Sequence, residues 1–510
     1  MRRCAAAPYR KVYLMKRGSG ILLPVFSLPS SYGIGTFGKE AYNFIDFLAA
    51  AGQEYWQMLP MGPTGFGDSP YQSFSAYAGN PYFIDLEFMA EDGLLSREEI
   101  ELVPQGEDLI QVNYGILYHQ RTSLLRKGFS RFDTQYDVAF DNFRKANAEW
   151  LNDYALYMSL KQYFDMKPWQ DWEDAGIRMY RRESVEKYSE LLQKDILFHC
   201  FIQFLFFSQW DGLRSYAKQK GIKFIGDIPI YLSMDSADAW ASSEILQYDK
   251  ERRPLKVGGV PPDYFSETGQ LWGNPLYDWE EMKKDGYCFW IRRLAASSEM
   301  FDAVRLDHFR GFESYWSVPF GEATAVKGEW MPGPGMDLIG RIKEKFPKLC
   351  IIAEDLGCLT PEVHELVRAA GFPGMNVLQF AFGSGNRCSY LPHRHNINSV
   401  VYTGTHDNTT VRGWFEDKAQ EEERVYAKKY LGLSSEEGWN WGFIRGAMGS
   451  PADLCIVQMQ DYLDLPDSAR TNTPGTLGGN WMWRLAPGQL TDGLAGKIAE
   501  MTRLYDRERL

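Results

Sequence analysis

The stretch Gly20-Ile21-Leu22-Leu23-Pro24-Val25-Phe26 opens the pattern that decides the fold of this 510-residue chain. Its apolar run predicts a buried strand. In residues 40–51, apolar side chains recur at positions i, i+3, i+4 and i+7, which indicates an amphipathic helix, and Gly52 is typical of a helix end. A second strand-like run follows at residues 55–59, so the segment reads as strand, helix and strand.

The same alternation continues along the chain. Further strand-like runs occur at residues 223–228, 302–307, 349–355, 375–382, 399–405 and 453–458. The clearest later helix covers residues 361–370, because Thr360 and Pro361 form a favourable start and Gly371 a stop. Eight apolar strands alternating with helices predict an α/β fold, and that number of units favours a closed (β/α)8 TIM barrel over an open sheet.

Two connections are too long for a bare barrel. Residues 85–195, between strands 2 and 3, are expected to form a mainly helical insertion, and residues 230–300, after strand 3, a loop-rich insertion or lid. The barrel is assigned to residues 15–84 and 196–510. The residues after 458 suffice for a loop and one helix, near 495–507, so no C-terminal β domain is expected.

Composition and charge exclude several classes of function. The chain has 67 Asp and Glu against 55 Lys and Arg, a net charge of −12, and no long basic run, which argues against nucleic-acid and anionic-membrane partners. Seven scattered cysteines suggest reduced thiols. The most apolar stretch, residues 196–210, is too short to span a bilayer, and the N-terminus has no apolar signal-peptide core. We expect a soluble, cytoplasmic protein.

Two motifs suggest a cofactor site or a metal site, but the residues around each of them argue against that interpretation. Gly33-Ile34-Gly35-Thr36-Phe37-Gly38 matches the dinucleotide-binding pattern, but a loop separates it from the preceding strand and no acid follows at the required distance. His393-Arg394-His395 has no Cys or acidic group at ligand spacing. We expect neither a cofactor nor a metal.

Acidic side chains stand at the ends of four predicted strands: Asp227, Asp307, Glu354 and Asp407. Taken singly, such an acid is more often a helix N-cap or part of a structural ion pair. The carboxyl ends of the strands meet at one mouth of a barrel, where barrel enzymes keep their catalytic groups. These four acids are therefore expected to converge on one site.

Paired carboxylates without a metal are what cleavage of a glycosidic bond requires. Strand alternation places Arg305 and Asp307 on one face, and the guanidinium is expected to keep Asp307 ionised. Crowding by Asp307 and Asp407 is expected to raise the pKa of Glu354, which then carries the proton. The 76 aromatic residues, 15% of the chain, offer flat surfaces for sugar rings.

At these residues the sequence resembles the 4-alpha-glucanotransferase family, also called amylomaltases or disproportionating enzymes, which are relatives of the alpha-amylases. The matching motifs, in chain order, begin at Gly20, Ser69, Gly226, Gly269, Arg305, Ala353, Gly404 and Asn472. They span nearly the whole chain. Residues 1–14 lie upstream of the family's usual start and are expected to be a dispensable extension.

The resemblance implies that Asp307 is the nucleophile, Glu354 the general acid and base, and Asp407 the stabiliser of the transition state. It further implies a set of substrate-binding residues: Arg305, His308, His406 and Asp227 around the donor sugar, Tyr71 and Trp272 as stacking or lid residues, Tyr264 in the lid, and Asn472.

The predicted activity is the transfer of an alpha-1,4-glucan segment to the 4-hydroxyl of an acceptor glucose or maltodextrin by a retaining, two-step mechanism. Residues 258–275 are expected to close over the site, with Tyr264, Phe265 and Trp272 excluding water. Two alternatives stay open at this point: an alpha-glucan hydrolase, and a catalytically inactive glucan-binding protein.

Overall fold

A computed structural model describes residues 16–65, 67–103, 109–135, 137–262, 266–357 and 359–509. At its centre, eight parallel strands form one sheet in the order β10-β11-β12-β1-β2-β3-β6-β9. In chain order they are β1 (Gly18–Leu22), β2 (Tyr55–Gln57), β3 (Lys223–Ile228), β6 (Ala303–Leu306), β9 (Cys350–Ala353), β10 (Gly374–Val377), β11 (Ser399–Tyr402) and β12 (Leu454–Gln458). Each strand overlaps one of the eight predicted runs.

The sheet curls into a nearly closed barrel, because its two outer strands, β9 and β10, also meet. The Ala353 N–H donates to the Pro373 carbonyl at 2.9 Å. The Met375 N–H donates to the Asp355 carboxylate at 2.7 Å. Every residue of β1, β2, β6, β11 and β12 is buried, as expected for strands covered on both faces. The predicted (β/α)8 TIM barrel is confirmed.

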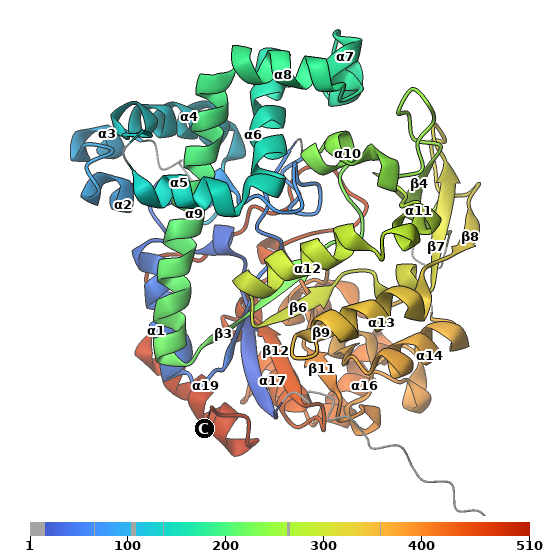
Figure 1. Cartoon of the computed structure of the whole chain (residues 1–510). Helices are drawn as coiled ribbons and strands as arrows, with labels where there is room; N and C mark the ends of the chain where they lie inside the picture. The colour runs from blue at the N-terminus through green and yellow to red at the C-terminus, as the bar shows by residue number, and fades with distance from the viewer. Residues whose placement is uncertain are drawn as a thin grey trace, which may run out of the picture.

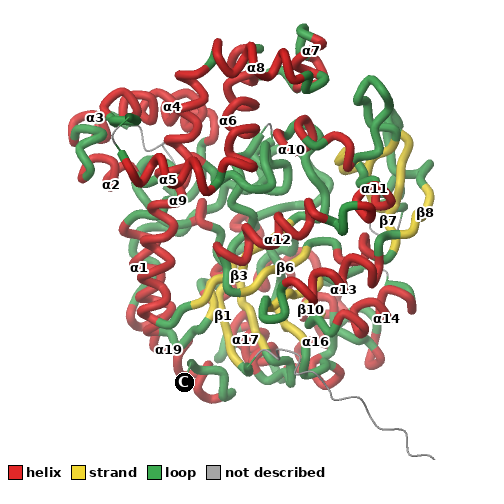
Figure 2. The backbone as a smooth tube through the Cα atoms, viewed as in Figure 1, coloured by secondary structure: helices red, strands yellow, loops and turns green. Residues whose placement is uncertain are grey.

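Helices surround the strands, which lie in the middle of the molecule (Figure 1; Figure 2). Those next to the barrel are α1 (Lys39–Ala50), α9 (Gln193–Lys220), α12 (Cys288–Met300), α13 (Gly335–Lys345), α14 (Pro361–Ala370), α16 (Glu421–Leu431), α17 (Trp439–Met448) and α19 (Asp492–Leu504). Two match the clearest sequence signals. Gly52 follows α1 with a φ of 67°, and Gly371 ends α14 with a φ of 72°. Both values lie in the left-handed region that glycine favours.

A helical insertion stands between β2 and β3, and it extends across the top of Figure 1 from the left side to the right of centre. Its helices are α2 (Leu86–Glu91), α3 (Arg97–Glu101), α4 (Tyr114–Arg131), α5 (Val138–Ala146), α6 (Ala148–Tyr163), α7 (Ala175–Arg178) and α8 (Arg182–Leu191). The long helix α9 packs on both α6 and α1. The expected boundary at residue 196 therefore falls inside a continuous helix, which joins the insertion firmly to the barrel.

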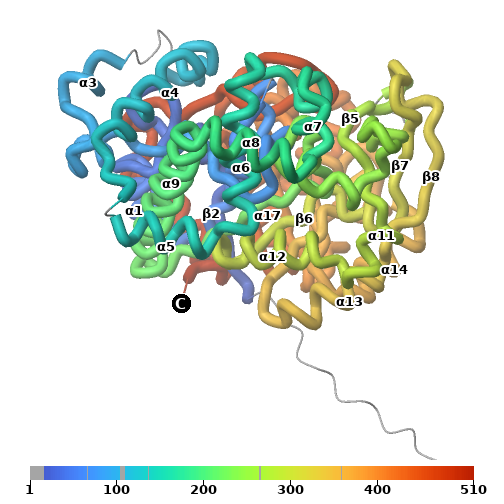
Figure 3. The backbone as a smooth tube through the Cα atoms, turned by 45° about the horizontal axis from the view of Figure 1, so that its top comes forward, coloured from blue at the N-terminus to red at the C-terminus, as the bar shows by residue number. Residues whose placement is uncertain are grey.

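A second, antiparallel sheet was not predicted from the sequence. Its order is β5-β4-β7-β8. The strands are β4 (Lys256–Val260), β5 (Gln270–Pro275), β7 (Ser314–Pro319) and β8 (Glu329–Pro332). The expected loop-rich insertion of residues 230–300 thus contains the hairpin of β4 and β5 and ends in helix α12, and the hairpin pairs with β7 from a further insertion after β6. Figure 3 shows this sheet on the side of the barrel opposite α3 and α4.

The remaining short helices are α10 (Ala237–Ala241), α11 (Trp279–Lys284), α15 (Val411–Gly413) and α18 (Met459–Tyr462). Residues 459–509, all described, contain α18, α19 and a short 3-10 helix but no strand. Among the described residues, no single helix has the length and apolar character to cross a membrane. One pair, α8 with α9, passes by length and composition, but the two helices meet at an angle of 84°.

Candidate active site

Three adjacent strands deliver the predicted acids to one end of the barrel. β6 lies between β3 and β9, and Asp227 of β3 is the register partner of Arg305 of β6. Asp307 directly follows β6, and Glu354 directly follows β9. The ladder of parallel strands therefore places these four side chains side by side, as the strand-end pattern predicted.

Arg305 bridges two carboxylates. Its Nη1 donates to both oxygens of Asp227 at 2.8 Å and lies 3.0 Å from Oδ1 of Asp307. Arg305 and Asp227 are buried, whereas 27% of the Asp307 side chain is exposed. This confirms that Arg305 and Asp307 share a face. It also shows that Asp307 is the member of the group that a substrate can reach.

Backbone N–H groups hold the Glu354 carboxylate. The His308 N–H donates to Oε2 at 2.7 Å, and the Leu356 N–H donates to Oε1 at 3.1 Å. His308 has a φ of 47°, an uncommon value for a residue with a side chain. This backbone turn directs the N–H of the residue after Asp307 toward Glu354, so one loop orients both acids.

The protonation of this pair differs in part from expectation. Burial raises the pKa of Asp307 to about 8, with the Asp227, Glu354 and Asp407 charges adding to the rise, although Arg305 opposes it. Arg305 thus lowers the pKa of Asp307, in the predicted direction, but burial raises it by more, so the pair of acids in the free protein retains a proton near neutral pH. Burial is also the first cause of the raised pKa of Glu354, ahead of any neighbouring carboxylate.

A chain of hydrogen bonds connects Asp227 to the loop after β11. The Tyr71 hydroxyl donates to Oδ2 of Asp227 at 2.7 Å and lies 2.8 Å from Nε2 of His406. A hydroxyl has a single proton, so Nε2 of His406 is the donor in the second bond. Burial lowers the pKa of His406, which leaves a neutral ring at neutral pH. The Tyr71 and His406 rings stack at 5.3 Å.

Asp407 reaches the site from a loop rather than from a strand end. Its Oδ1 accepts a hydrogen bond from Nδ2 of Asn472 at 2.6 Å and lies 3.4 Å from Nε2 of His406. The exposed fraction of the Asp407 side chain is 42%, so it faces the open mouth. The structure thus brings Asp407 and Asn472 together, although 65 residues separate them in the chain.

The hairpin formed by β4 and β5 brings Trp272 to the site. The Trp272 ring meets the His308 ring edge-on, with centroids 4.9 Å apart. Nδ2 of Asn274, at the base of β5, donates to the Leu232 carbonyl at 2.7 Å, and Gln72 donates to its amide oxygen at 3.1 Å. The base of the hairpin is therefore anchored. Tyr264, predicted to belong to the lid, lies outside the described residues.

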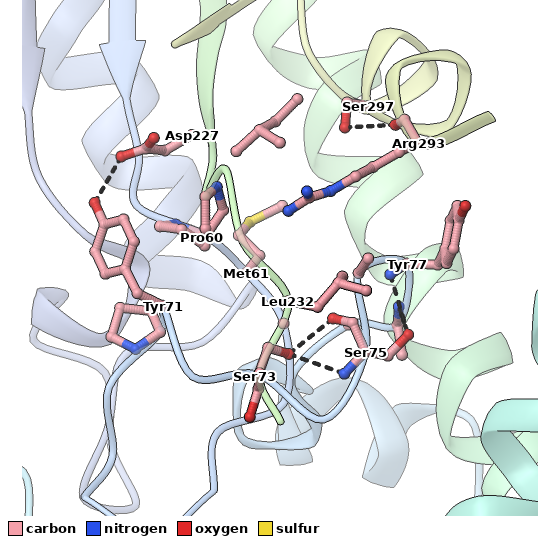
Figure 4. A pocket seen from close by; sticks show the side chains of 18 of the residues that line it. Pro60, Met61, Tyr71, Ser73, Ser75, Tyr77, Asp227, Leu232, Arg293 and Ser297 are labelled. Carbon is pink, nitrogen blue, oxygen red and sulfur yellow. Dashed lines mark hydrogen bonds between the residues drawn. The ribbon is translucent and has the colours of Figure 1, made fainter. Parts of the chain in front are cut away.

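A cavity of about 80 Å³ extends behind Asp227 and Tyr71 (Figure 4). Met61 and Leu232 form part of its wall, and the Arg293 side chain runs along one side (Figure 4). Asp307 and Glu354 do not line it. The cavity therefore borders the site on the β3 side and does not contain the reacting acids.

The rejected motifs have structural roles. A Cβ on Gly35 would lie 1.8 Å from the Val25 carbonyl, and one on Gly38 would lie 1.9 Å from the Asp85 carboxylate, so close packing accounts for these glycines. Of the two histidines, His395 bonds Ser450 and the Tyr390 carbonyl. Among the described residues, no group of three or more His, Cys, Asp and Glu is arranged to hold a metal ion.

Comparison with known proteins agrees with this geometry. A family model described as 4-alpha-glucanotransferase matches residues 23–491 of the chain. The chain belongs to the 4-alpha-glucanotransferase family. A 4-alpha-glucanotransferase from Clostridium butyricum is 50% identical over 484 residues, which cover 95% of this chain and 99% of that protein. One from Thermus thermophilus is 45% identical over 504 residues, covering 97% and 99%.

A solved structure of a relative has the same architecture. Amylomaltase from Streptococcus agalactiae in complex with acarbose superposes with a TM-score of 0.94 at 39% identity, covering 97% of this chain and 100% of that one. The resemblance stated from the motifs is thus confirmed for the family and for the fold.

Two residues of this family member were missed in the sequence. The Trp481 ring lies 5.8 Å from that of Tyr71 and 6.0 Å from that of His406. Arg470 donates to the carbonyls of Asp407 and Asn472. Arg470 precedes the Asn472 motif and Trp481 follows it. Their closeness to this motif in the sequence was the signal that could have identified them as site residues.

Proposed function

We propose that the chain catalyses 4-alpha-glucanotransfer, moving a segment of an alpha-1,4-glucan to the 4-hydroxyl of an acceptor glucose or maltodextrin. The substrates are maltodextrins and fragments of starch or glycogen, and the free thiols of its described cysteines fit action in the cytoplasm. The observation that supports this most is the pairing of a partly exposed Asp307, in contact with Arg305, with a Glu354 held by two backbone N–H groups.

In the first step, the Asp307 carboxylate attacks the anomeric carbon of the donor glucan. The bond from that carbon to the leaving oxygen breaks, and the leaving oxygen takes the proton of Glu354. The step needs one proton on the pair, and the raised pKa values of both acids retain it at neutral pH. Arg305 stabilises the Asp307 anion when Glu354 holds that proton.

In the second step, Glu354 takes the proton of the acceptor's 4-hydroxyl. The acceptor oxygen bonds to the anomeric carbon and displaces Asp307, so two inversions retain the original configuration. Asp407 stabilises the charge on the sugar in both transition states and binds its hydroxyls. Trp272 and the hairpin around it exclude water while the acceptor binds, which favours transfer over hydrolysis.

Incubation with maltotriose tests the proposal. Transfer yields longer maltodextrins together with glucose, and the total number of reducing ends stays constant. Hydrolysis instead raises the number of reducing ends, so steadily rising ends without longer products would establish a hydrolase. Glucan affinity without any turnover would establish a binding protein. Asp307→Asn serves as the control that separates enzymatic turnover from contamination.

A further inference from the structure

The loop that carries His406 and Asp407 begins where the β11 ladder ends. β11 stops at Tyr402, and α15 begins at Val411. Within the loop, Oδ1 of Asn408 accepts from the Thr405 N–H at 2.8 Å and from its hydroxyl at 2.9 Å. These internal bonds fix the shape of the loop, but they do not attach it to the barrel.

One buried carboxylate attaches both ends of this loop. Oδ2 of Asp461 accepts the Thr403 hydroxyl at 2.5 Å, and Oδ1 accepts the Val411 N–H at 2.7 Å. Thr403 is the first residue after β11, and Val411 is the first residue of α15. Asp461 therefore joins the two ends of the loop with His406 and Asp407, while side chains from other segments bond residues in the middle of the loop.

Asp461 is itself held firmly. It sits in α18, directly after β12, and only 1% of the residue is exposed. Nδ2 of Asn440 donates to its carbonyl at 2.9 Å. Burial raises the pKa of Asp461 to about 7. Burying an acid is costly unless its oxygens are hydrogen-bonded, and both oxygens of Asp461 are bonded to the ends of the loop.

We propose that Asp461 is a positioning residue for the transfer reaction, which fixes His406 and Asp407 relative to Asp307 by clamping both ends of residues 403–411. The inference rests on the function proposed above. It assigns the residue no contact with the substrate. Asp461 acts through the loop, and the loop carries the groups that face the sugar.

Two substitutions at this position separate the clamp from the charge. Asp461→Asn keeps an oxygen for the Val411 N–H and offers an N–H to the Thr403 hydroxyl, so both bonds can form again. Asp461→Ala removes both. If the clamp matters, the alanine variant loses about a hundredfold in kcat, because a displacement of about 1 Å has such an effect, while the asparagine variant stays within about tenfold of wild type.

Asp85 provides a matched control. It is also buried, its Oδ2 accepts the Thr36 hydroxyl at 2.5 Å, and its Oδ1 accepts two backbone N–H groups at the start of α2. Its bonds are thus of the same kind, but they hold the helical insertion. Asp85→Ala is expected to lower the melting temperature as much as Asp461→Ala while leaving kcat within about threefold of wild type.

The kinetic measurement is transfer from maltotriose, with kcat and KM determined separately for all four proteins at a temperature where each is folded. A fall in kcat for Asp461→Ala alone, with recovery in Asp461→Asn, supports the clamp. Equal losses in Asp461→Ala and Asp85→Ala would overturn it, because general destabilisation would then explain both. Equal losses in the alanine and asparagine variants would overturn it as well.

Crystal structures of wild type and Asp461→Ala make the test independent of the activity. Displacement of residues 403–411, with Asp307 and Glu354 in place, supports the positioning role. An unmoved loop contradicts it, whatever the kinetics show. If the wild-type protein does not produce maltodextrins longer than maltotriose, the proposed function is refuted. The displacement of the loop in the crystal structures would still test the clamp, so the two failures are distinguishable.

Discussion

The two sides of the barrel mouth position their acids by different means. On the β3, β6 and β9 side, Asp307 and Glu354 each stand one residue beyond a strand. On the β11 and β12 side, Asp407 stands five residues beyond Tyr402, the last residue of its strand. The first side is positioned by the backbone ladder, whereas the second depends on side chains from other segments, among them Asn472 and Asp461.

This difference predicts how each side responds to mutation. A strand end is fixed by hydrogen bonds that no side-chain substitution removes, so changes there affect chemistry and leave geometry intact. A loop fixed by side chains can move when one of them is lost. Substitutions on the first side should therefore abolish single chemical steps, while those on the second should weaken catalysis gradually.

The largest effect is expected for Asp307→Asn. The amide cannot form the covalent intermediate, so turnover of maltotriose should fall to nearly nothing while the fold survives. Steady-state kinetics and circular dichroism measure the two parts. Activity within about tenfold of wild type would contradict the role as nucleophile and the first half of the comparison.

Glu354→Gln should follow, with a loss of about a hundredfold to ten-thousandfold on natural glucans. Glutamine keeps one oxygen for one of the two N–H groups of His308 and Leu356, while its NH2 cannot accept from the other, so the variant loses the proton together with one of these bonds. Donors with a good leaving group need no protonation and should partly recover the rate of the first step. Equal loss on both kinds of donor would argue against a role as general acid.

The same division explains what the sequence could predict. Asp227, Asp307 and Glu354 were found because they stand at the ends of apolar runs, which parallel strands bring together, and Arg305 was found because strand alternation places it on the face of Asp307. Asp407 was found as well, since His406-Asp407 follows its strand closely. The contact between Asp227 and Arg305 follows from the register of β3 and β6, which is set by the hydrophobic pattern of the two strands.

Features that depend on contacts between distant segments were not predicted. The antiparallel sheet was missed because the glycines and prolines of residues 258–275 suggest a loop, whereas pairing with β7 makes part of it a strand. Trp481 and the roles of Asp461 were missed for a similar reason. The raised pKa of Asp307 was not predicted because the sequence does not show how strongly burial acts on this acid.

Asn472→Ala tests the second half of the comparison. Loss of the 2.6 Å bond to Asp407 frees that carboxylate, and kcat should fall roughly tenfold, as expected for a hydrogen bond to a charged group. Asn43→Ala, on the exposed surface of α1, is the control. A loss as complete as that of Asp307→Asn would show that Asp407 is as rigidly required as the strand-end acids.

Trp272→Ala should change the outcome of the reaction more than its rate. Removing the ring that meets His308 admits water, so the share of hydrolysis rises a few-fold while kcat falls only slightly. The ratio of new reducing ends to longer maltodextrins measures this share. Trp439→Ala, which removes a half-buried tryptophan stacked on Phe415, should leave the ratio unchanged. An unchanged ratio in Trp272→Ala would remove the hairpin from the explanation of transfer.

The smallest expected effect is on stability. It concerns Asp307, one of the two acids that stand at strand ends. An aspartate ordinarily has a pKa of 3.8, whereas burial raises the pKa of Asp307 to about 8, so between these values the native protein binds more protons than the unfolded chain. Its contribution to stability therefore falls as the pH rises through that window. Asparagine does not titrate, so Asp307→Asn should melt a few degrees above wild type, and the gap should widen from pH 5 to pH 8. Glu183→Gln, at an exposed site, should show no such gap. A gap that stays constant from pH 5 to pH 8 would mean that Arg305, and not burial, decides the charge of Asp307, because the acid would then be ionised in both the native and the unfolded state.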